Sequence, residues 1–153
     1  MNSRVVAVWW LAGLLIGSSA VLAEDLDWTP LHTAADKGDL AAAESLLKRQ
    51  PALIEAKEAG RHTPLHLAAG NGDTRMVKFL LDHGANVNAR DICGWTPLHT
   101  AVFGNRPAVA ELLLARSADL DAKDKQGQTP LRLAEKYHHP DLANLLRQHG
   151  AQE

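Results

Sequence analysis

One tetrapeptide recurs through this chain at nearly constant spacing. Thr-Pro-Leu-His begins at Thr29, Thr63 and Thr96, and it returns at Thr129 with Arg in place of His, so the offsets are 34, 33 and 33 residues. A fixed period of this length is the signature of a repeat architecture, in which each unit buries its apolar face against its neighbours. The chain is therefore expected to fold as a row of similar units.

Each unit is predicted to form two short helices joined by a turn. Thr is a good N-cap and Pro suits the first helical position, so Thr63-Pro64 predicts the start of the first helix. Gly72 can adopt the left-handed conformation that ends this helix, and Asp73 can cap the next one. The second helix is expected to end at Gly84, before a loop rich in Asp, Gly and Asn.

This pattern resembles the ankyrin repeat family, whose period and signature tetrapeptide it shares. The resemblance implies an all-α repeat solenoid of four helix-turn-helix units, with short β-hairpin-like finger loops projecting from one edge. The expected repeats cover residues 24–57, 58–90, 91–123 and 124–153. Repeat 4 departs from the family pattern at Arg132 and Glu135, and polar replacements of this kind suit a terminal repeat that faces water.

The first 23 residues differ from the rest of the chain. Arg4 is the only charged residue among them, residues 5–16 are strongly apolar, and Val21-Leu22-Ala23 offers small residues where a signal peptidase cuts. We expect a signal peptide cleaved after Ala23, which makes residues 24–153 a small exported protein, secreted or, in a Gram-negative bacterium, periplasmic. The alternative is a retained anchor, because about 20 apolar residues can span a bilayer.

Composition and motifs argue against several functions. The net charge of -2 does not favour nucleic acid as a partner, and no membrane contact is expected after cleavage. Phosphate-binding loops, nucleophile elbows and His-Glu-x-x-His zinc motifs do not occur in the sequence. The chain is therefore predicted to be no enzyme and to carry no cofactor.

The eight histidines are the main argument for a ligand-binding protein. His32, His66 and His99 hold equivalent positions in successive repeats. Stacked helices lie about 8–10 Å apart, whereas two imidazoles on one zinc need nitrogens within roughly 3–4 Å, so these three cannot share a metal. The resemblance implies instead that each braces a neighbouring loop through its backbone. A small-ligand or metal-binding protein built on the histidines remains the alternative function.

The expected binding surface is a long, shallow face made by the finger tips and the first helices, suited to gripping another protein. Trp95 and Phe103 are apolar where this face should be polar, with Ile92 on the same finger and Tyr137 one repeat along. Because binding energy concentrates in such aromatic residues, they form the predicted hot spot. The polar members of the expected site are Arg61, His62, Asn71, Gln126 and Gln128. The alternative is that Trp95 and Phe103 merely pack on each other.

Cys93 is the only cysteine and lies on the same finger. With no second cysteine to form an internal disulfide, it is a candidate redox site that can form a mixed disulfide, link two chains into a dimer or be oxidised. The alternative is an incidental small residue in a monomer. The sequence as a whole predicts a non-enzymatic module that binds another protein outside the cytoplasm through repeats 2 and 3.

Overall fold

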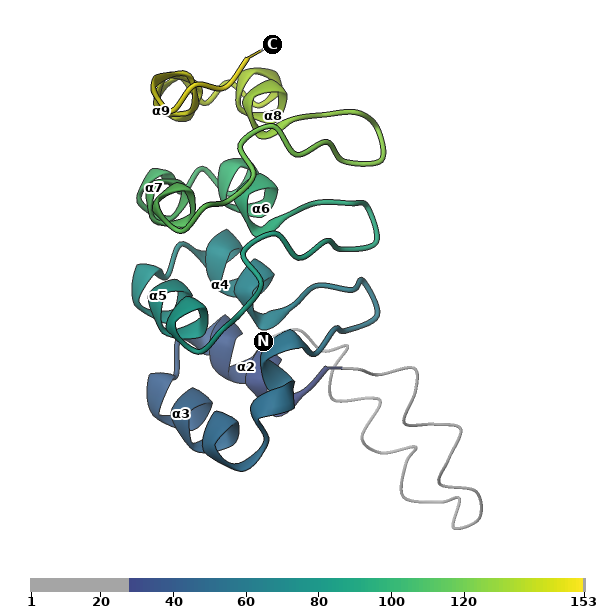
Figure 1. Ribbon diagram of the computed structural model, residues 1–153, viewed down its shortest axis with the longest axis vertical. Coiled ribbons are helices and arrows are strands. Elements are labelled where there is room, and N and C mark those ends of the chain that lie inside the picture. The colour runs from purple at the N-terminus through teal and green to yellow at the C-terminus, as the bar shows by residue number, and fades with distance from the viewer. Residues whose placement is uncertain (1–27, 153) are drawn as a thin grey trace, which may run out of the picture.

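The computed structural model describes residues 28–152, so the predicted signal peptide lies outside the described residues. The described part is a stack of four helix pairs (Figure 1). The pairs are α2 (Pro30–Lys37) with α3 (Leu40–Arg49), α4 (Pro64–Asn71) with α5 (Thr74–Asp82), α6 (Pro97–Phe103) with α7 (Pro107–Ala115), and α8 (Pro130–Lys136) with α9 (Pro140–Gln148). The short 3-10 helix η1 (Pro51–Glu55) follows α3. The predicted all-α repeat solenoid is confirmed.

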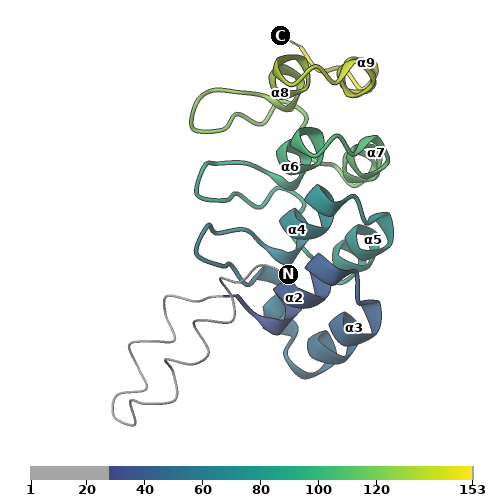
Figure 2. The same ribbon diagram turned by 180° about the vertical axis from the view of Figure 1, so that it is seen from behind.

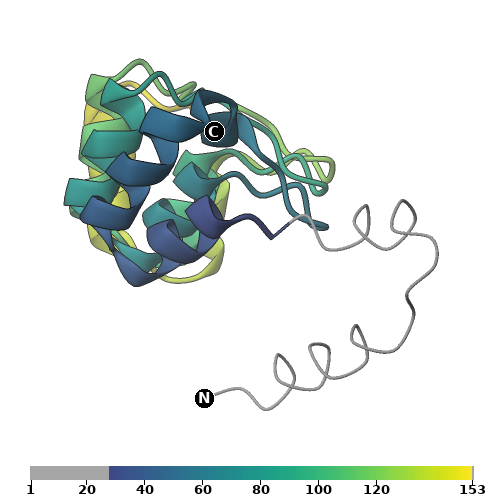
Figure 3. The same ribbon diagram turned by 90° about the horizontal axis from the view of Figure 1, so that it is seen from below.

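The first helix of each pair lies between the second helix and the projecting loops. Figures 1 and 2 show α2, α4, α6 and α8 as an inner row, with α3, α5, α7 and α9 as an outer row. Viewed from below, the loops project to one side of both rows and lie over one another (Figure 3). We call these loops the fingers. No helix between residues 28 and 152 is long and apolar enough to cross a bilayer.

The inner helices begin as the signature tetrapeptide predicts, with an added role for the histidine. In repeat 3 the backbone N–H of His99 donates to the Thr96 hydroxyl (3.5 Å), while the backbone N–H of Thr96 donates to His99 Nδ1 (3.2 Å). This reciprocal pairing is a capping box, in which histidine replaces the usual Glu or Gln. Pro97 occupies the first turn, where its missing N–H costs no hydrogen bond.

The outer helix of repeat 2 starts where the sequence predicts. Asp73 Oδ1 accepts the backbone N–H groups of Arg75 and Met76, both at 3.0 Å. Before this start Gly72 adopts a left-handed φ of 81°. His138, which departs from the family residue at the equivalent position, adopts the same conformation with φ 57°. The turn therefore keeps its shape without glycine in repeat 4.

A single apolar core runs the length of the stack. The signature leucine of every inner helix is buried, as is a leucine near the end of every outer helix. These residues are Leu31, Leu65, Leu98, Leu131, Leu47, Leu80, Leu113 and Leu146. Because α4 packs between α2 and α6, and α6 between α4 and α8, each repeat covers the apolar face of its neighbour.

Each finger is a tight hairpin turn organised by an acidic side chain. Asp91 Oδ1 accepts the N–H groups of Cys93 (2.8 Å) and Trp95 (2.7 Å), and the Asp91 N–H donates to the Trp95 carbonyl (3.0 Å). Neighbouring fingers are joined by backbone hydrogen bonds, such as that from the Lys125 N–H to the Cys93 carbonyl (3.0 Å). The predicted β-hairpin-like fingers therefore form a connected row.

Alanine substitution at two finger glycines tests how closely the fingers pack. Gly94 and Gly127 both have a left-handed φ, at 81° and 74°. A Cβ on Gly94 would lie 3.1 Å from the backbone nitrogen of Lys125, whereas one on Gly127 would meet nothing within 4 Å. We expect Gly127→Ala to lower the free energy of unfolding by about 1 kcal/mol, and Gly94→Ala by about 2 kcal/mol. Urea unfolding of both variants tests this difference, and equal losses would show that the fingers are not closely packed.

Candidate functional site

The finger face is the surface formed by the finger tips and the exposed side chains of the inner helices. Four large apolar side chains of the described residues are exposed: Trp28 (46%), Ile92 (52%), Phe103 (49%) and Tyr137 (39%). Three of the four come from repeats 3 and 4, while Trp28 belongs to repeat 1. Exposed apolar side chains are therefore concentrated towards the C-terminal half of this face.

Three aromatic rings form a continuous row there, which we call the aromatic cluster. The Trp95 and Phe103 ring centroids are 5.3 Å apart. Phe103 and Tyr137 are 5.0 Å apart and almost perpendicular, with an interplanar angle of 85°. Aromatic pairs favour this edge-to-face geometry. The predicted hot-spot residues of two repeats thus lie together, from the base of one finger to the end of α8.

Trp95 has a structural role within the cluster. Its indole Nε1 donates to Asp124 Oδ2 (3.0 Å), which ties the finger of repeat 3 to that of repeat 4. Desolvation raises the pKa of Asp124, but hydrogen bonds from the backbone of Gln128 and Gln126 and from the Trp95 indole bring it below its ordinary value. Trp95 packs on Phe103, as the structural alternative expected. Phe103 and Tyr137 nevertheless remain exposed and available to a partner.

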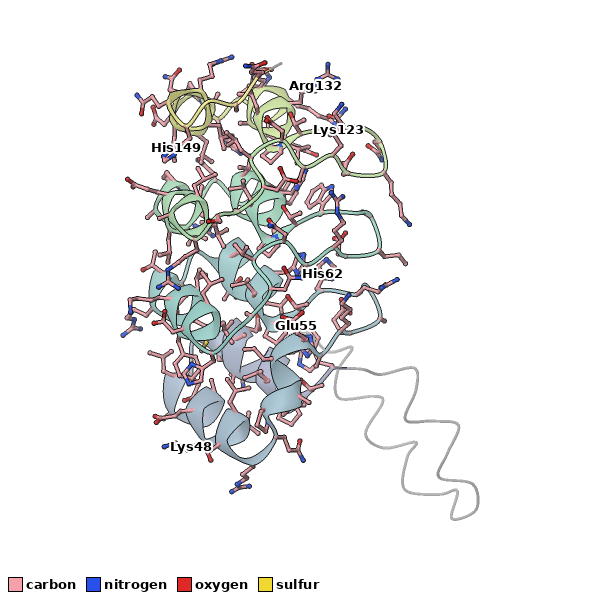
Figure 4. The ribbon with its side chains drawn as sticks, viewed as in Figure 1. Lys48, Glu55, His62, Lys123, Arg132 and His149 are labelled. Carbon is pink, nitrogen blue, oxygen red and sulfur yellow. The ribbon has the colours of Figure 1, made fainter. Side chains whose placement is uncertain are left out.

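A hollow of about 420 Å³ opens beside the cluster. Its walls come from the fingers of repeats 3 and 4 and from α8, and include Ile92, Trp95, Lys125, Gln126, Leu133 and Tyr137. A smaller hollow of about 240 Å³ lies at the C-terminal end of the stack, where Figure 4 shows Lys123 and Arg132. That second hollow has no aromatic residue in its wall. The first is therefore the better candidate for recognition.

The polar residues of the predicted site divide into two groups. Gln126 is exposed and lines the hollow, and the backbone carbonyl of Gln128 accepts a hydrogen bond from His99 Nε2 (3.2 Å). Arg61 is exposed on the finger of repeat 2. The other two use their side chains in contacts between repeats, which the sequence did not reveal.

His62 and Asn71 are the two residues with such contacts. The imidazole of His62 contacts Glu58 through Nδ1 and lies 3.3 Å from Asp91 Oδ2 through Nε2. Asn71 Nδ2 donates to the backbone carbonyl of Asp36 (3.0 Å). Both side chains therefore join neighbouring repeats.

Sequence reasoning missed three residues that line the hollow, namely Asp124, Lys125 and Leu133. Lys125 lies one repeat length after Ile92, at the equivalent finger-tip position, and contributes to the same wall. The repeat offset from Ile92 was the signal that could have identified it. Lys136, the last residue of α8, also lines the hollow.

The signature histidines connect the repeats, as the family resemblance implied. His66 Nε2 donates to the Trp95 carbonyl (3.0 Å), and His32 makes the same contact with the His62 carbonyl (3.0 Å). Because the backbone N–H of Thr63 can only donate, His66 Nδ1 must accept its hydrogen bond, and the imidazole is neutral. Burial lowers the pKa of His66 to about 4. His32 and His99 are shifted in the same direction for the same reason.

No set of three or more His, Cys, Asp or Glu side chains between residues 28 and 152 is placed to hold a metal ion. Figure 4 shows His62 beside the fingers and His149 at the opposite side of the stack. Cys93 is exposed at its finger tip and contributes to the hollow. Its proposed redox role remains a prediction.

Comparison with known proteins agrees with this architecture. A sequence profile for ankyrin repeats (3 copies) matches residues 7–91, 31–124 and 89–153. A putative ankyrin repeat protein of Rickettsia bellii is 50% identical over 50 residues, which cover 33% of this chain and 20% of that protein. The serine/threonine-protein kinase VIK of Arabidopsis thaliana is 44% identical over 57 residues, covering 37% and 13% of the two chains. The E3 ubiquitin-protein ligase XBAT33 of Arabidopsis thaliana is 42% identical over 65 residues, covering 42% and 13%.

The matched segments are a small part of each relative. The alignments take in no more than 20% of the length of these three proteins, so the similarity concerns a stretch of repeats and not the whole of a kinase or a ligase. The profile matches, in contrast, extend over most of the present chain. The chain belongs to the ankyrin repeat family.

Proposed function

We propose that this chain is a non-enzymatic interaction module that binds a partner protein through the finger face of repeats 2 and 3, with Tyr137 of repeat 4 at the edge of the site. Ankyrin repeats generally mediate protein–protein interaction, which supports the class of function. The observation that carries the proposal is the aromatic cluster. Phe103 and Tyr137 are each more than a third exposed although their rings already contact each other.

Clusters of this kind are where binding energy concentrates. Trp and Tyr are enriched among the few interface residues whose truncation costs more than about 2 kcal/mol of binding free energy. The rings are held in place before binding, since Trp95 is fixed by Asp124 and by its contact with Phe103. A preorganised site loses less side-chain entropy when the partner docks. The cluster therefore fits the anchor of an interface.

We further propose that the module acts outside the cytoplasm, in the periplasm or after secretion. The basis is the basic, apolar and small-residue order of residues 1–23, which is typical of a signal peptide. The alternative function, a small-ligand or metal-binding protein, gains no specific support. Three of the eight histidines, those of the signature, use both ring nitrogens in contacts with the protein itself.

The test is capture of the partner on purified protein from the extracytoplasmic fraction of the source cells. We expect Phe103→Ala/Tyr137→Ala to weaken partner binding by at least about 30-fold, because two aromatic anchors are removed. Neither Phe103 nor Tyr137 makes a side-chain hydrogen bond within residues 28–152. Trp95→Ala would break the hydrogen bond to Asp124, so a loss of binding could then result from a loss of stability. The affinity for each captured protein can be measured by calorimetry.

Trp28→Ala is the matched control for the capture. Trp28 is an equally exposed aromatic residue that occupies the Trp95 position in repeat 1. Its removal should leave the affinity within about twofold, since hot spots are surrounded by near-neutral contacts. A partner that binds the double variant as tightly as the wild type would place the binding site elsewhere.

A further inference from the structure

Two unpaired positive charges stand at the rim of the hollow. Lys125 lies at the finger tip of repeat 4 and Lys136 at the end of α8, and both contribute to the wall. Within residues 28–152 neither lysine forms an ion pair, in contrast to Lys48 and Lys78, which pair with Glu44 and Asp82 on the outer helices. The rim is therefore positive although the chain as a whole has a net charge of -2.

One carboxylate, that of Asp124, shares the wall with the two lysines, so the residues of the hollow carry two positive charges against one negative. Asp124 is only 9% exposed, and its oxygens are already occupied. Oδ1 accepts the N–H groups of Gln126 and Gln128, each at 2.8 Å, and Oδ2 accepts the Trp95 indole at 3.0 Å. Its oxygens therefore offer little to a ligand that approaches from solvent, whereas the two lysines are exposed at the rim.

Apolar and cationic groups alternate around the opening. Lys136 Nζ lies 5.6 Å from the centroid of the Tyr137 ring. Ile92 stands half exposed on the neighbouring finger, and Leu133 contributes to the wall from α8. A volume of about 420 Å³ is at the lower end of the range for pockets that accept organic groups, and it suits one bulky side chain. The site therefore combines an apolar recess with positive charge at its edge.

We propose that the hollow binds an acidic segment of the partner protein in which one bulky apolar side chain is flanked by carboxylates. The apolar side chain enters between Ile92, Leu133 and Tyr137, and the carboxylates pair with Lys125 and Lys136. Charge complementarity at the rim sets the orientation and the association rate, while the apolar contact supplies most of the affinity. This inference rests on the proposed function, because it assigns the chemistry of the partner at the same site.

Selection from a random peptide library displayed on phage, with purified protein as bait, tests the inference without knowledge of the natural partner. We expect the enriched peptides to contain Phe, Trp or Leu with Asp or Glu on both sides. A fluorescent synthetic copy of the strongest peptide is then titrated by anisotropy. The charge-reversed variant Lys125→Glu/Lys136→Glu should weaken its binding by about tenfold, since two attractive pairs become repulsive.

Lys37→Glu/Arg49→Glu is the control with an equal change in net charge. Both residues are exposed in repeat 1, near the ends of α2 and α3, and neither forms an ion pair in the described part of the chain. This variant should bind the peptide within about twofold of the wild type, because exposed charges farther away than a Debye length of about 10 Å are screened. Raising the salt concentration to 1 M should weaken wild-type binding by about fivefold.

The outcomes separate this inference from the proposed function. Peptides without carboxylates, or equal binding by the charge-reversed variant, would overturn the acidic partner, while loss of binding in Phe103→Ala/Tyr137→Ala would still support the proposed site. Enrichment of no peptide would overturn the inference. If neither the charge-reversed variant nor Phe103→Ala/Tyr137→Ala reduced peptide binding, both this inference and the proposed binding site would be contradicted. Sedimentation tests whether a second copy of this chain occupies the hollow instead. Self-association that rises with concentration in the wild type and is absent from the charge-reversed variant would identify that second copy as the occupant and overturn the inference.

Discussion

Acidification from pH 7 to pH 4 is expected to destabilise the repeat stack by several kcal/mol, with the buried signature histidines as the main cause. Burial lowers the pKa of His66 from 6.5 to about 4. A difference of this size corresponds to roughly 3 kcal/mol of unfolding free energy for His66 alone. His32 and His99, whose pKa values burial also lowers, change the stability in the same direction.

The sign follows from proton uptake. Between pH 6.5 and about 4 the unfolded chain binds a proton at His66 that the folded chain does not bind. The free energy of unfolding therefore falls as the pH falls through this window, and the stabilisation is complete only above pH 6.5. The structural reason is that both ring nitrogens are committed. A proton on Nδ1 would face the Thr63 N–H, which can only donate.

Urea unfolding, followed by circular dichroism at several pH values between 7 and 4.5, measures this effect. His66→Gln keeps an acceptor for the capping box but cannot titrate, so it should flatten the dependence of stability on pH while lowering stability at pH 7 by about 1–2 kcal/mol. His83→Gln is the control, because His83 is exposed and its Nδ1 lies 2.8 Å from the Phe79 carbonyl of its own helix. A pH dependence unchanged in His66→Gln would exclude His66 as the cause.

Leu98→Ala is expected to lower the free energy of unfolding by about 2–5 kcal/mol. Leu98 is fully buried in α6, which packs against both α4 and α8, so the cavity would lie inside the stack. Because α6 also carries Phe103, the variant should lose partner binding at temperatures where repeat 3 unfolds. The same experiment at low temperature should restore it.

Leu145→Ala is the matched comparison for this prediction. Leu145 is half-buried on α9, in the last repeat, and its removal should cost about 1 kcal/mol. Thermal and urea unfolding of the two variants give the difference directly. Equal losses would mean that the core near Leu98 collapses to fill the cavity, and that repeat 3 is not more tightly packed than the end of the stack.

Local signals in the sequence were sufficient for the helix pairs. The Thr-Pro start, the left-handed residue at Gly72 and the Asp73 cap each act over a few residues, so the chain around them determines the local structure. Repetition of these signals at a fixed period then implied stacking. The backbone contacts of His66 were also predictable, although only through the family resemblance.

Side-chain contacts between repeats were beyond such reasoning. The Trp95–Asp124 bond joins residues 29 positions apart, and the Asn71–Asp36 contact joins residues 35 apart. Each contact depends on which side chain the neighbouring repeat places opposite, and a pattern within one repeat does not encode that. Lys125 differs from these contacts, because its repeat offset from Ile92 indicates a finger-tip position and only its share in the hollow depends on how one finger lies over the next.

The histidine contacts also determine how unfolding spreads. Each imidazole caps its own helix through Nδ1 and reaches the next finger through Nε2, so it is at once part of a unit's intrinsic stability and of its coupling to the following unit. In a linear array the balance of these two quantities decides whether the units melt together or one by one. Because one imidazole contributes to both the intrinsic stability and the coupling, unfolding of one repeat lowers the stability of the next. The row of short helices is then expected to unfold as one cooperative element.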